Sequence, residues 1–301
     1  MKREGLDKPI VLGFFQDGVD NEWKLTVSNS IKDSANENGI DLQFTDAQLT
    51  QENQIKAIRK FIKDKVDVIA FTPIVSSGWE TVLAEAKEAG IPVILVDRFV
   101  KDDSLWTAWI GNDQVEEGRK AARWLVEYMN IIGKGNGKIN VVELEGAVGS
   151  EVAIERKTGF EEIIKNYPNY AIKMSLNCGF TRELGKNVME EFLINDGHKI
   201  DVVFAQNDEM AIGAIEAIEE YGLRPGKDII IVSIDAGKDA FKTMMAAKLN
   251  CTVECSPVMG PKLMEAVKDL VNGKKIPKKI YVPEDVFPME NAARIYPTRK
   301  Y

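Results

Sequence analysis

The sequence predicts an α/β protein made of two similar lobes, each a doubly wound parallel sheet covered by helices. Three observations predict this fold. Apolar segments of strand length alternate with amphipathic segments of helix length, several apolar runs lack polar alternation, and the second half of the chain repeats the first. Strand–helix alternation specifies a parallel sheet. Runs such as Val93–Val96 are typical of strands that such a sheet buries on both faces.

The first half of the chain carries four strand segments separated by three helical segments. Trp23, Val27 and Ile31 recur at helical spacing, and Gly39 ends that helix. The next two helices have their apolar stripes around Ile58 and Val82. The predicted strands are Ile10–Phe15, Ile40–Phe44, Val66–Phe71 and Val93–Val96.

The second half repeats this pattern. The segment from Lys65 to Thr72 resembles the segment from Lys199 to Gln206, and each leads, after a helix, to an apolar strand that ends in an aspartate. These aspartates are Asp97 and Asp235. The predicted strands are Ile139–Leu144, Ile172–Leu176, Val202–Ala205, Ile229–Ile234 and Cys251–Glu254. The predicted helices are Ala153–Asn166, Thr181–Asn195, Glu209–Tyr221, Asp239–Ala247 and Val258–Asn272, followed by an extended tail punctuated by prolines.

Composition excludes several classes of protein. The net charge of −8 over 301 residues argues against nucleic acid or an anionic membrane as a partner. No apolar run approaches the roughly 20 residues that span a bilayer. The single histidine, His198, lies in a polar turn, so a His-rich zinc site is excluded. Three cysteines form no disulfide framework, and we expect buried free thiols at Cys178, Cys251 and Cys255.

The strand-to-helix turns lack phosphate-binding motifs. The segment from Gly13 to Gly18 does not follow the Gly-x-Gly-x-x-Gly pattern, and no Walker sequence occurs. This argues against a dinucleotide-dependent dehydrogenase and against a P-loop NTPase, and we expect no cofactor.

Polar side chains gather instead where the predicted strands end, which is where open α/β sheets bind ligands. Asp97 and Arg98, directly after an apolar run, carry the strongest signal, although a structural ion pair that closes the strand is the alternative. Carboxylates accept from sugar hydroxyls, a guanidinium donates two bonds, and aromatic rings cover the apolar faces of a sugar. The strand-end set is Thr72, Asp97, Arg98, Gln206, Asn207, Asp208 and Asp235.

Other residues keep two interpretations. Trp23 could cover a sugar or belong to the core, Phe180 could cover a sugar or act as a helix-preceding staple, and Arg156 could be a solvated helix charge. Asp97 and Asp235 resemble the paired acids of a glycosidase. Arg98 beside Asp97 would lower the pKa that a catalytic acid needs raised, so binding without turnover is favoured.

Several motifs together resemble one known family. They are Gln51–Ala57, Gly78–Glu80, Val96–Arg98, Val142–Gly146, Val152–Lys157, Phe180–Arg182, Ala205–Met210, Pro225–Ile229 and Ser233–Asp235. Over essentially its whole length the chain resembles the periplasmic sugar-binding proteins of ABC transporters, of the ribose/galactose type and periplasmic binding protein class I. Within the family it is most similar to the galactofuranose-binding members.

This resemblance implies two lobes crossed three times by the chain and closing on a monosaccharide. The expected N-terminal lobe is 8–112 plus 256–282, and the C-terminal lobe is 113–255 plus 283–301, joined by short strand-like crossings. Lys24, Thr72 and Cys255 depart from the ribose pattern, which has an aromatic and two amides there, and so argue against ribose. The implied ligand set is Gln16, Trp23, Lys24, Thr72, Asp97, Arg98, Arg156, Phe180, Asn207 and Asp235.

The resemblance also implies a role. We expect an extracytoplasmic solute-binding protein that passes galactofuranose, or a related furanose or aldose, to the permease subunits of an ABC importer. It implies a monomer with no catalytic residue, no metal and no cofactor. Residues 1–8 show no apolar signal-peptide region, so we expect a chain without its leader, working in a periplasm or tethered outside the cell by a lipid.

Two alternatives come from other classes. The effector domain of a lactose-repressor-type regulator shares this fold, but about 50–60 residues of basic helix-turn-helix should precede it. Here the first predicted strand starts by Ile10. A sugar-processing enzyme would form a product, whereas a binding protein returns its sugar unchanged.

Overall fold

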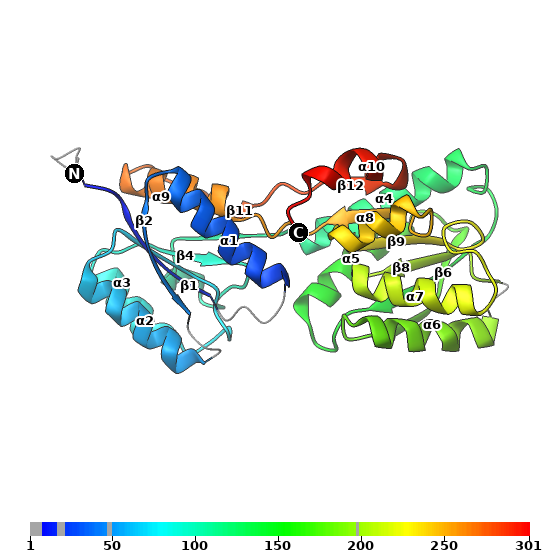
Figure 1. Cartoon of the computed structure of the whole chain (residues 1–301). Helices are drawn as coiled ribbons and strands as arrows, with labels where there is room; N and C mark the ends of the chain where they lie inside the picture. The colour runs from blue at the N-terminus through cyan, green and yellow to red at the C-terminus, as the bar shows by residue number, and fades with distance from the viewer. Residues whose placement is uncertain (1–7, 17–21, 47–49, 197–198) are drawn as a thin grey trace. The chain divides into compact units, whose positions relative to one another are not determined.

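The computed structural model describes residues 8–16, 22–46, 50–196 and 199–301 (Figure 1). The chain divides into two compact units, Met1–Asn112 with Pro257–Pro283 and Asp113–Ser256 with Glu284–Tyr301. It therefore passes between the units three times, and the residues at these junctions belong to neither helix nor strand. Each unit holds one six-stranded sheet covered by helices, which confirms the predicted α/β fold with two similar lobes.

The first unit has strand order β11-β5-β4-β3-β1-β2, with all pairs parallel. Its strands are β1 (Val11–Gln16), β2 (Asp41–Asp46), β3 (Val68–Phe71), β4 (Val93–Val96), β5 (Ala108–Gly111) and β11 (Lys279–Tyr281). Its helices are α1 (Glu22–Glu37), α2 (Gln51–Asp64), α3 (Glu80–Glu88) and α9 (Gly260–Val271).

Alternate side chains of the first sheet enter two separate cores, because successive residues of a strand point to opposite faces. Phe14 packs with α1 and α9 on one face, while Phe15 packs with α2 and α3 on the other. Both phenylalanines are fully buried. Helices on both faces explain why these strands read as unbroken apolar runs.

The second unit has strand order β12-β10-β9-β8-β6-β7, in which only the β10–β12 pair is antiparallel among the described strands. Its strands are β6 (Ile139–Glu145), β7 (Tyr170–Asn177), β8 (Val202–Ala205), β9 (Ile230–Asp235), β10 (Cys251–Glu254) and β12 (Val286–Pro288). Its helices are α4 (Gln114–Ile131), α5 (Glu151–Ile164), α6 (Arg182–Asp196), α7 (Asp208–Glu220), α8 (Lys238–Met245) and α10 (Ala292–Ile295).

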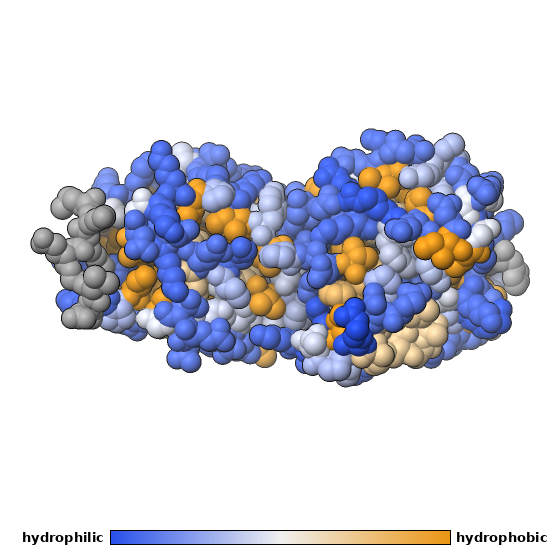
Figure 2. Space-filling model, turned by 90° about the horizontal axis from the view of Figure 1, so that it is seen from above, coloured by the Kyte–Doolittle hydropathy of each residue, from blue (hydrophilic) through white to orange (hydrophobic). Residues whose placement is uncertain are grey.

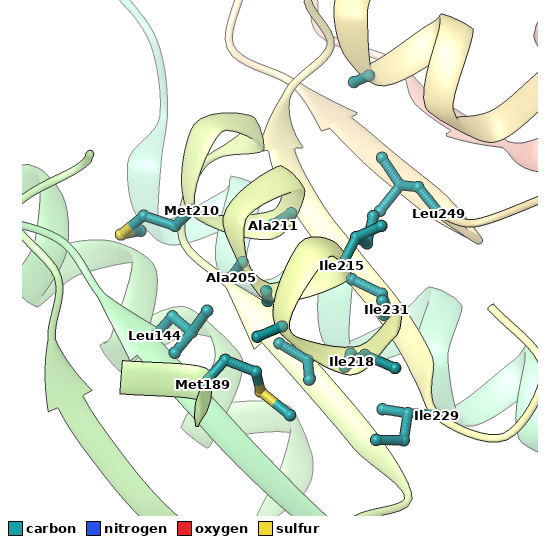
Figure 3. Close-up of a cluster of buried hydrophobic side chains, with 14 of the residues drawn as sticks. Leu144, Met189, Ala205, Met210, Ala211, Ile215, Ile218, Ile229, Ile231 and Leu249 are labelled. Atoms are coloured by element: carbon teal, nitrogen blue, oxygen red, sulfur yellow. The ribbon is translucent and has the colours of Figure 1, made fainter. Parts of the chain in front are cut away.

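The largest core of the second unit lies where α6, α7 and α8 cover one face of its sheet. Figure 3 shows Ile215 and Ile218 of α7 beside Ile231 of β9 and Ile229, which directly precedes that strand, with Met189 of α6 nearby. On the opposite face α4 and α5 pack together, and Phe160 of α5 stacks on Phe204 of β8 with 4.0 Å between ring centroids.

The internal repeat has a structural counterpart. Each of the two repeated segments contains an aspartate directly before a strand. Asp67 precedes β3, which pairs with β1, and Asp201 precedes β8, which pairs with β6. Oδ2 of Asp67 accepts from the amide of Val11 at 2.9 Å, and Oδ2 of Asp201 accepts from the amide of Asn140 at 2.7 Å. Both aspartates therefore satisfy an otherwise unpaired strand amide in the same way.

The structure also corrects the prediction in two regions. Strand β5 and helix α4 occupy the stretch between Phe99 and Lys138, where the sequence analysis assigns no element. The tail after α9 is not extended throughout, because β11 and β12 are followed by short helical turns from Met289 to Thr298. No described helix is long and apolar enough to cross a membrane. In the view of Figure 2 the surface is mostly hydrophilic, with scattered hydrophobic residues.

Candidate functional site

The carboxyl ends of the first unit's parallel strands meet at one edge of its sheet. Gln16 ends β1, Thr72 follows β3, Asp97 follows β4 and Asn112 follows β5. Because these strands are neighbours in register, their terminal side chains lie along the same edge. Asn112, buried to 1% exposure, is a candidate that the sequence analysis missed, although its place directly after an apolar strand is a usable signal.

Gln16 joins β1 to α1. Its Nε2 donates to the carbonyl of Lys24 at 3.0 Å, and its Oε1 accepts from the hydroxyl of Ser28. The side chain is buried, and both of these hydrogen bonds hold the first part of α1 against the end of β1. Trp23 and Lys24 in that first part of α1 are both half-buried, and Trp23 packs against the core that α1 and α9 share.

Thr72 presents a buried hydroxyl with no hydrogen-bond partner in the described part of the chain. The residue is 2% exposed, and its carbonyl accepts from Nε2 of Gln54 at 2.9 Å. An unpaired buried hydroxyl costs about 1–3 kcal/mol. Such a group at the ligand-binding edge of a sheet is typical of a position that a bound molecule satisfies.

Asp97 adopts a left-handed backbone conformation, with φ of 66°. Its amide donates to the carbonyl of Ile110 at 2.8 Å, and its carbonyl accepts from the Trp109 indole at 2.9 Å. These two bonds fix a conformation that a non-glycine residue rarely adopts. Arg98 follows with an exposed side chain.

In the second unit, Arg156 of α5 is the centre of the polar cluster. Its Nε donates to Oε2 of Glu117 at 2.7 Å, Nη1 to the carbonyl of Gln206 at 2.5 Å, and Nη2 to Oδ1 of Asp235 at 3.3 Å. The residue is only 3% exposed, so the interpretation as a solvated helix charge is wrong. Burial alone would lower the pKa of Arg156, but the carboxylates of Glu117 and Asp235 hold it above its ordinary value.

Two glycines let α4 and α5 approach closely enough to form this cluster. A Cβ on Gly118 of α4 would collide with the carbonyl of Arg156, and a Cβ on Gly159 of α5 would collide with the carbonyl of Val115. Glu117 and Arg156 neighbour these glycines, so the close contact of the two helices brings the charged pair together.

Asp235 ends β9 in an unusual backbone conformation, with φ of 126°. Burial raises the pKa of its carboxyl; Arg156 opposes that rise, while nearby Asp208 and Glu117 add to it. The side chain of Asp235 is 31% exposed, so part of this carboxylate is open to solvent. Within the second unit it is an acceptor available to a bound molecule.

Asn207 and Phe180 are coupled. Oδ1 of Asn207 caps α7 by accepting from the amide of Met210 at 2.9 Å, and its Nδ2 donates to the carbonyl of Phe180 at 3.2 Å. Phe180 has φ of 63°, and its ring lies so close to Gly146 that a Cβ there would overlap it. The half-buried ring also packs against the core around α6 and α7.

The other strand-end residues have internal roles. The side chain of Gln206 is fully buried, and it donates to Glu143 at 3.0 Å and accepts from the amide of Gly146 at 2.8 Å. Burial raises the pKa of Asp208 to about 6. Glu117, which the sequence analysis missed, gives no local signal because its role depends on its contact with another helix.

The structure thus brings Arg156 into contact with Asp235, and Asn207 into contact with Phe180. Four other predicted residues lie along the edge of the first sheet or in the adjoining turn: Gln16, Thr72, Asp97 and Arg98. Their part in binding stays a prediction. Cys178, Cys251 and Cys255 are buried free thiols, as expected. His198 lies outside the described residues.

Two surface hollows in the described part of the chain lie away from these residues. One of about 470 Å³ lies between the end of α5 and the start of β7, and its lining includes Tyr167 and Tyr170. A second, of about 310 Å³, adjoins Trp106 in the first unit. Neither contains a predicted site residue, and both are open to solvent, so the polar edges of the sheets remain the better candidates.

Comparison with known proteins connects these edges to a family. A model described as a periplasmic binding protein domain matches residues 12–275. The galactofuranose-binding protein of Escherichia coli is 43% identical over 299 residues, covering 98% of this chain and 92% of that protein.

Two solved structures are also similar over nearly the whole chain. One is the periplasmic binding component of the arabinose ABC transporter from Shewanella, bound to α- and β-L-arabinofuranose, with 45% identity, a TM-score of 0.81, and coverage of 96% of this chain and 95% of that one. The other comes from Mycobacterium smegmatis in complex with β-D-fucofuranose, with 46% identity, a TM-score of 0.79, and coverage of 97% and 95%.

Proposed function

The chain belongs to the periplasmic binding protein family, and on this premise we propose that it is the extracytoplasmic solute-binding protein of an ABC importer for a furanose sugar. The observation that carries the proposal is the set of relatives. Proteins 43–46% identical over nearly the whole chain are named for galactofuranose or are seen with arabinofuranose or fucofuranose.

The geometry of each unit supports this assignment. The second unit offers the carboxylate of Asp235 beside the guanidinium of Arg156, joined at 3.3 Å. The first unit offers the buried, unpartnered hydroxyl of Thr72. A sugar hydroxyl both donates and accepts, so it satisfies either kind of group.

The proposed ligand contacts are those implied by the family motifs. Asp97 and Arg98 in the first unit and Arg156, Asn207 and Asp235 in the second supply hydrogen bonds. Gln16 and Thr72 contribute from the edge of the first sheet, and Lys24 contributes from α1. Trp23 and Phe180 supply the aromatic cover, because both rings are half-buried and keep an accessible part.

Binding is coupled to delivery by closure of the two units around the sugar. A ligand that contacts both units favours the closed state by its difference in affinity for the two states. The closed form then offers the permease subunits a surface that the open form lacks. We place the protein in a periplasm or tethered outside the membrane by a lipid, acting as a monomer.

The identity of the sugar is narrowed by three departures from the ribose pattern. Lys24, Thr72 and the buried Cys255 replace the aromatic and amide groups of ribose-binding relatives. A thiol and a hydroxyl form fewer hydrogen bonds than two amides. We therefore propose galactofuranose, arabinofuranose or a similar furanose, rather than ribose.

A thermal-shift screen tests the function. The panel is L-arabinose, D-galactose, D-fucose and D-ribose at millimolar concentration, with protein refolded from denaturant to remove any sugar that co-purifies. A ligand at about a thousand times its dissociation constant adds roughly 4 kcal/mol to stability. In a protein of this size that raises the melting temperature by about 8–16 °C.

We expect such a shift with at least one of the first three sugars, a smaller one with D-ribose, and unchanged sugar on chromatography afterwards. Formation of a product would identify an enzyme instead. A silent panel after refolding would contradict the assignment to free monosaccharides.

A further inference from the structure

The loop after β9 has a backbone that must be held in place. Asp235 and Ala236 have φ of 126° and 63°, so two consecutive non-glycine residues adopt positive φ. Backbones of this kind cost on the order of 1–3 kcal/mol each and persist only where the surroundings impose them. The direction of the Asp235 carboxylate therefore depends on the contacts of the loop formed by residues 235–237.

One set of contacts comes from Asp208 beneath the loop. Its Oδ2 accepts from the amide of Gly237 at 2.8 Å, and its Oδ1 accepts from the hydroxyl of Thr252 at 2.8 Å. Oγ1 of Thr252 in turn accepts from the amide of Ala236 at 3.1 Å. Both amides that follow Asp235 are thus bound from the interior of the second unit.

The other contact comes from residues far along the chain. Nη2 of Arg299 donates to the carbonyl of Ala236 at 2.9 Å, and its Nη1 donates to Oε1 of Glu254 at 2.7 Å. Tyr301 donates to the same oxygen of Glu254 at 2.6 Å. Arg299 thus links the loop to β10, which is the neighbouring strand of β9.

Three aromatic rings hold the guanidinium in place. Its central carbon lies 4.3 Å from the ring centroid of Tyr301, 5.0 Å from that of Phe287 and 5.3 Å from that of Phe241. The Arg299 side chain is 8% exposed, so these contacts are largely shielded from water. A planar guanidinium stacks on rings and donates from two nitrogens at once, which a lysine ammonium does not do.

We propose that Arg299 is a positioning residue of the sugar site, which acts through the carbonyl of Ala236 to fix the carboxylate of Asp235. The inference rests on the proposed function, because Asp235 is an expected sugar contact there. When the carboxylate is already fixed, sugar binding does not have to order the loop, so the entropic cost of binding is smaller. When the loop opens, the fraction of competent protein falls and the apparent dissociation constant rises by the same factor.

The primary test is the variant Arg299→Lys, which keeps the charge opposite Glu254 but loses the fork. We expect sugar binding, measured by calorimetry with the sugar that gives the largest thermal shift, to weaken about 10-fold. The matched control is Arg294→Lys, an exposed arginine of α10 whose Nη2 donates to Oδ1 of Asn291 at 3.5 Å. The control should bind within about twofold of wild type, as is usual for an exposed surface change.

A double-mutant cycle separates positioning from a merely structural role. If Arg299 acts through Asp235, then in an Asp235→Asn background the Arg299→Lys change should weaken binding by less than about twofold. Residues that act independently add their effects in full. A full 10-fold loss in that background would overturn the proposal.

Amide hydrogen exchange gives a readout that needs no sugar. Arg299→Lys should speed exchange at Ala236 and Gly237 about 10-fold, since local opening controls their exchange. Amides of β8, such as that of Phe204, should not change. Tyr301→Phe, which keeps the ring and removes the hydroxyl that donates to Glu254, is a milder second variant that should shift both readouts in the same direction.

The outcomes keep the two claims apart. Wild type that binds no sugar of the panel contradicts the proposed function. Wild type that binds, together with an Arg299→Lys variant of equal affinity and unchanged exchange at residues 236–237, contradicts only the positioning role.

Discussion

Glu117 neutralises the buried guanidinium of Arg156 through an ion pair of 2.7 Å between Oε2 and Nε. Glu117 is fully buried and Arg156 nearly so, which leaves the pair little access to water. Removing two charges from water costs several kcal/mol each, so a pair of this kind is held by its geometry and its other hydrogen bonds. The other hydrogen bonds of Arg156 are donated to the carbonyl of Gln206 and to the carboxylate of Asp235.

Glu117→Gln should therefore destabilise the protein and weaken sugar binding. Breaking a buried ion pair costs about 3–5 kcal/mol, because the remaining charge is left uncompensated. Urea denaturation measures this loss. Glu162→Gln is the control. The Glu162 side chain is 38% exposed and pairs with Arg119, so this variant should lose much less stability than Glu117→Gln. Equal stability losses in the two variants would show that Arg156 does not depend on Glu117.

Thr72→Val should separate stability from affinity. Valine has the shape of threonine without the hydroxyl, and Oγ1 of Thr72 has no partner in the described part of the chain. We expect the free protein to be as stable as wild type or more stable by about 1 kcal/mol, because an unsatisfied group is removed. Sugar binding should weaken about 10-fold, since the hydroxyl is a proposed ligand contact.

Thr107→Val is the matched control for that experiment. Oγ1 of Thr107 accepts from the amide of Val93 at 3.2 Å, so its loss should destabilise the protein by about 1 kcal/mol. Its affinity for sugar should not change. A Thr72→Val variant with wild-type affinity would remove Thr72 from the site.

Asp208 predicts a pH dependence of stability. Burial raises its pKa to about 6, whereas the unfolded chain has the ordinary value near 4. Between about pH 4 and pH 6 the folded state holds this proton and the unfolded state releases it, so the contribution of Asp208 to stability falls as pH rises. Asp208→Asn should flatten this part of the curve of unfolding free energy against pH.

The same variant should be less stable than wild type even at pH 4. Its amide group provides one oxygen, whereas Asp208 accepts from Gly237 with one oxygen and from Ser233 and Thr252 with the other. Asp228→Asn is the control. Hydrogen bonds from Arg224 lower the pKa of Asp228 to about 2, so the contribution of Asp228 to the pH dependence of stability lies below pH 4. An unflattened curve in Asp208→Asn would show that Asp208 does not titrate in this window.

Trp23 provides an optical probe of binding. Its ring is half-buried, whereas Trp79, Trp106 and Trp109 are buried in the first unit. If Trp23 covers the sugar, ligand should change tryptophan fluorescence, and Trp23→Phe should abolish most of that change. Trp124→Phe, in α4 of the second unit, should keep it. A full signal in Trp23→Phe would place the ring in the core alone.

Much of the fold follows from local patterns in the sequence. Val93–Val96 and Val202–Ala205 are strands with the predicted bounds, because unbroken apolar runs identify strands buried on both faces. Helix α4 was missed although its cap is a visible signal, since Asp113 accepts from the amide of Glu116 at 3.0 Å. The short helical turns of the tail depend on packing against the second unit, which local periodicity does not report.

The candidate site is predictable only in part. Asp97 and Asp235 were recognisable because each ends an apolar strand, and both prove to have positive φ. Glu117 and Arg299 were not, because their roles come from contacts with residues 39 and 63 positions away. Such roles depend on which elements pack together and have no signature in the neighbouring sequence.

The central claim is that the chain binds a furanose sugar and returns it unchanged. Carbon-13 NMR of L-arabinose labelled at its anomeric carbon, added to refolded protein, tests it most directly because furanose and pyranose rings give separate anomeric signals. We expect a bound furanose signal that disappears in Asp235→Ala, and labelled sugar recovered intact after denaturation. A bound pyranose signal would contradict the furanose assignment. If neither L-arabinose nor equally labelled D-galactose and D-fucose gave a bound signal, the claim of sugar binding would itself be contradicted.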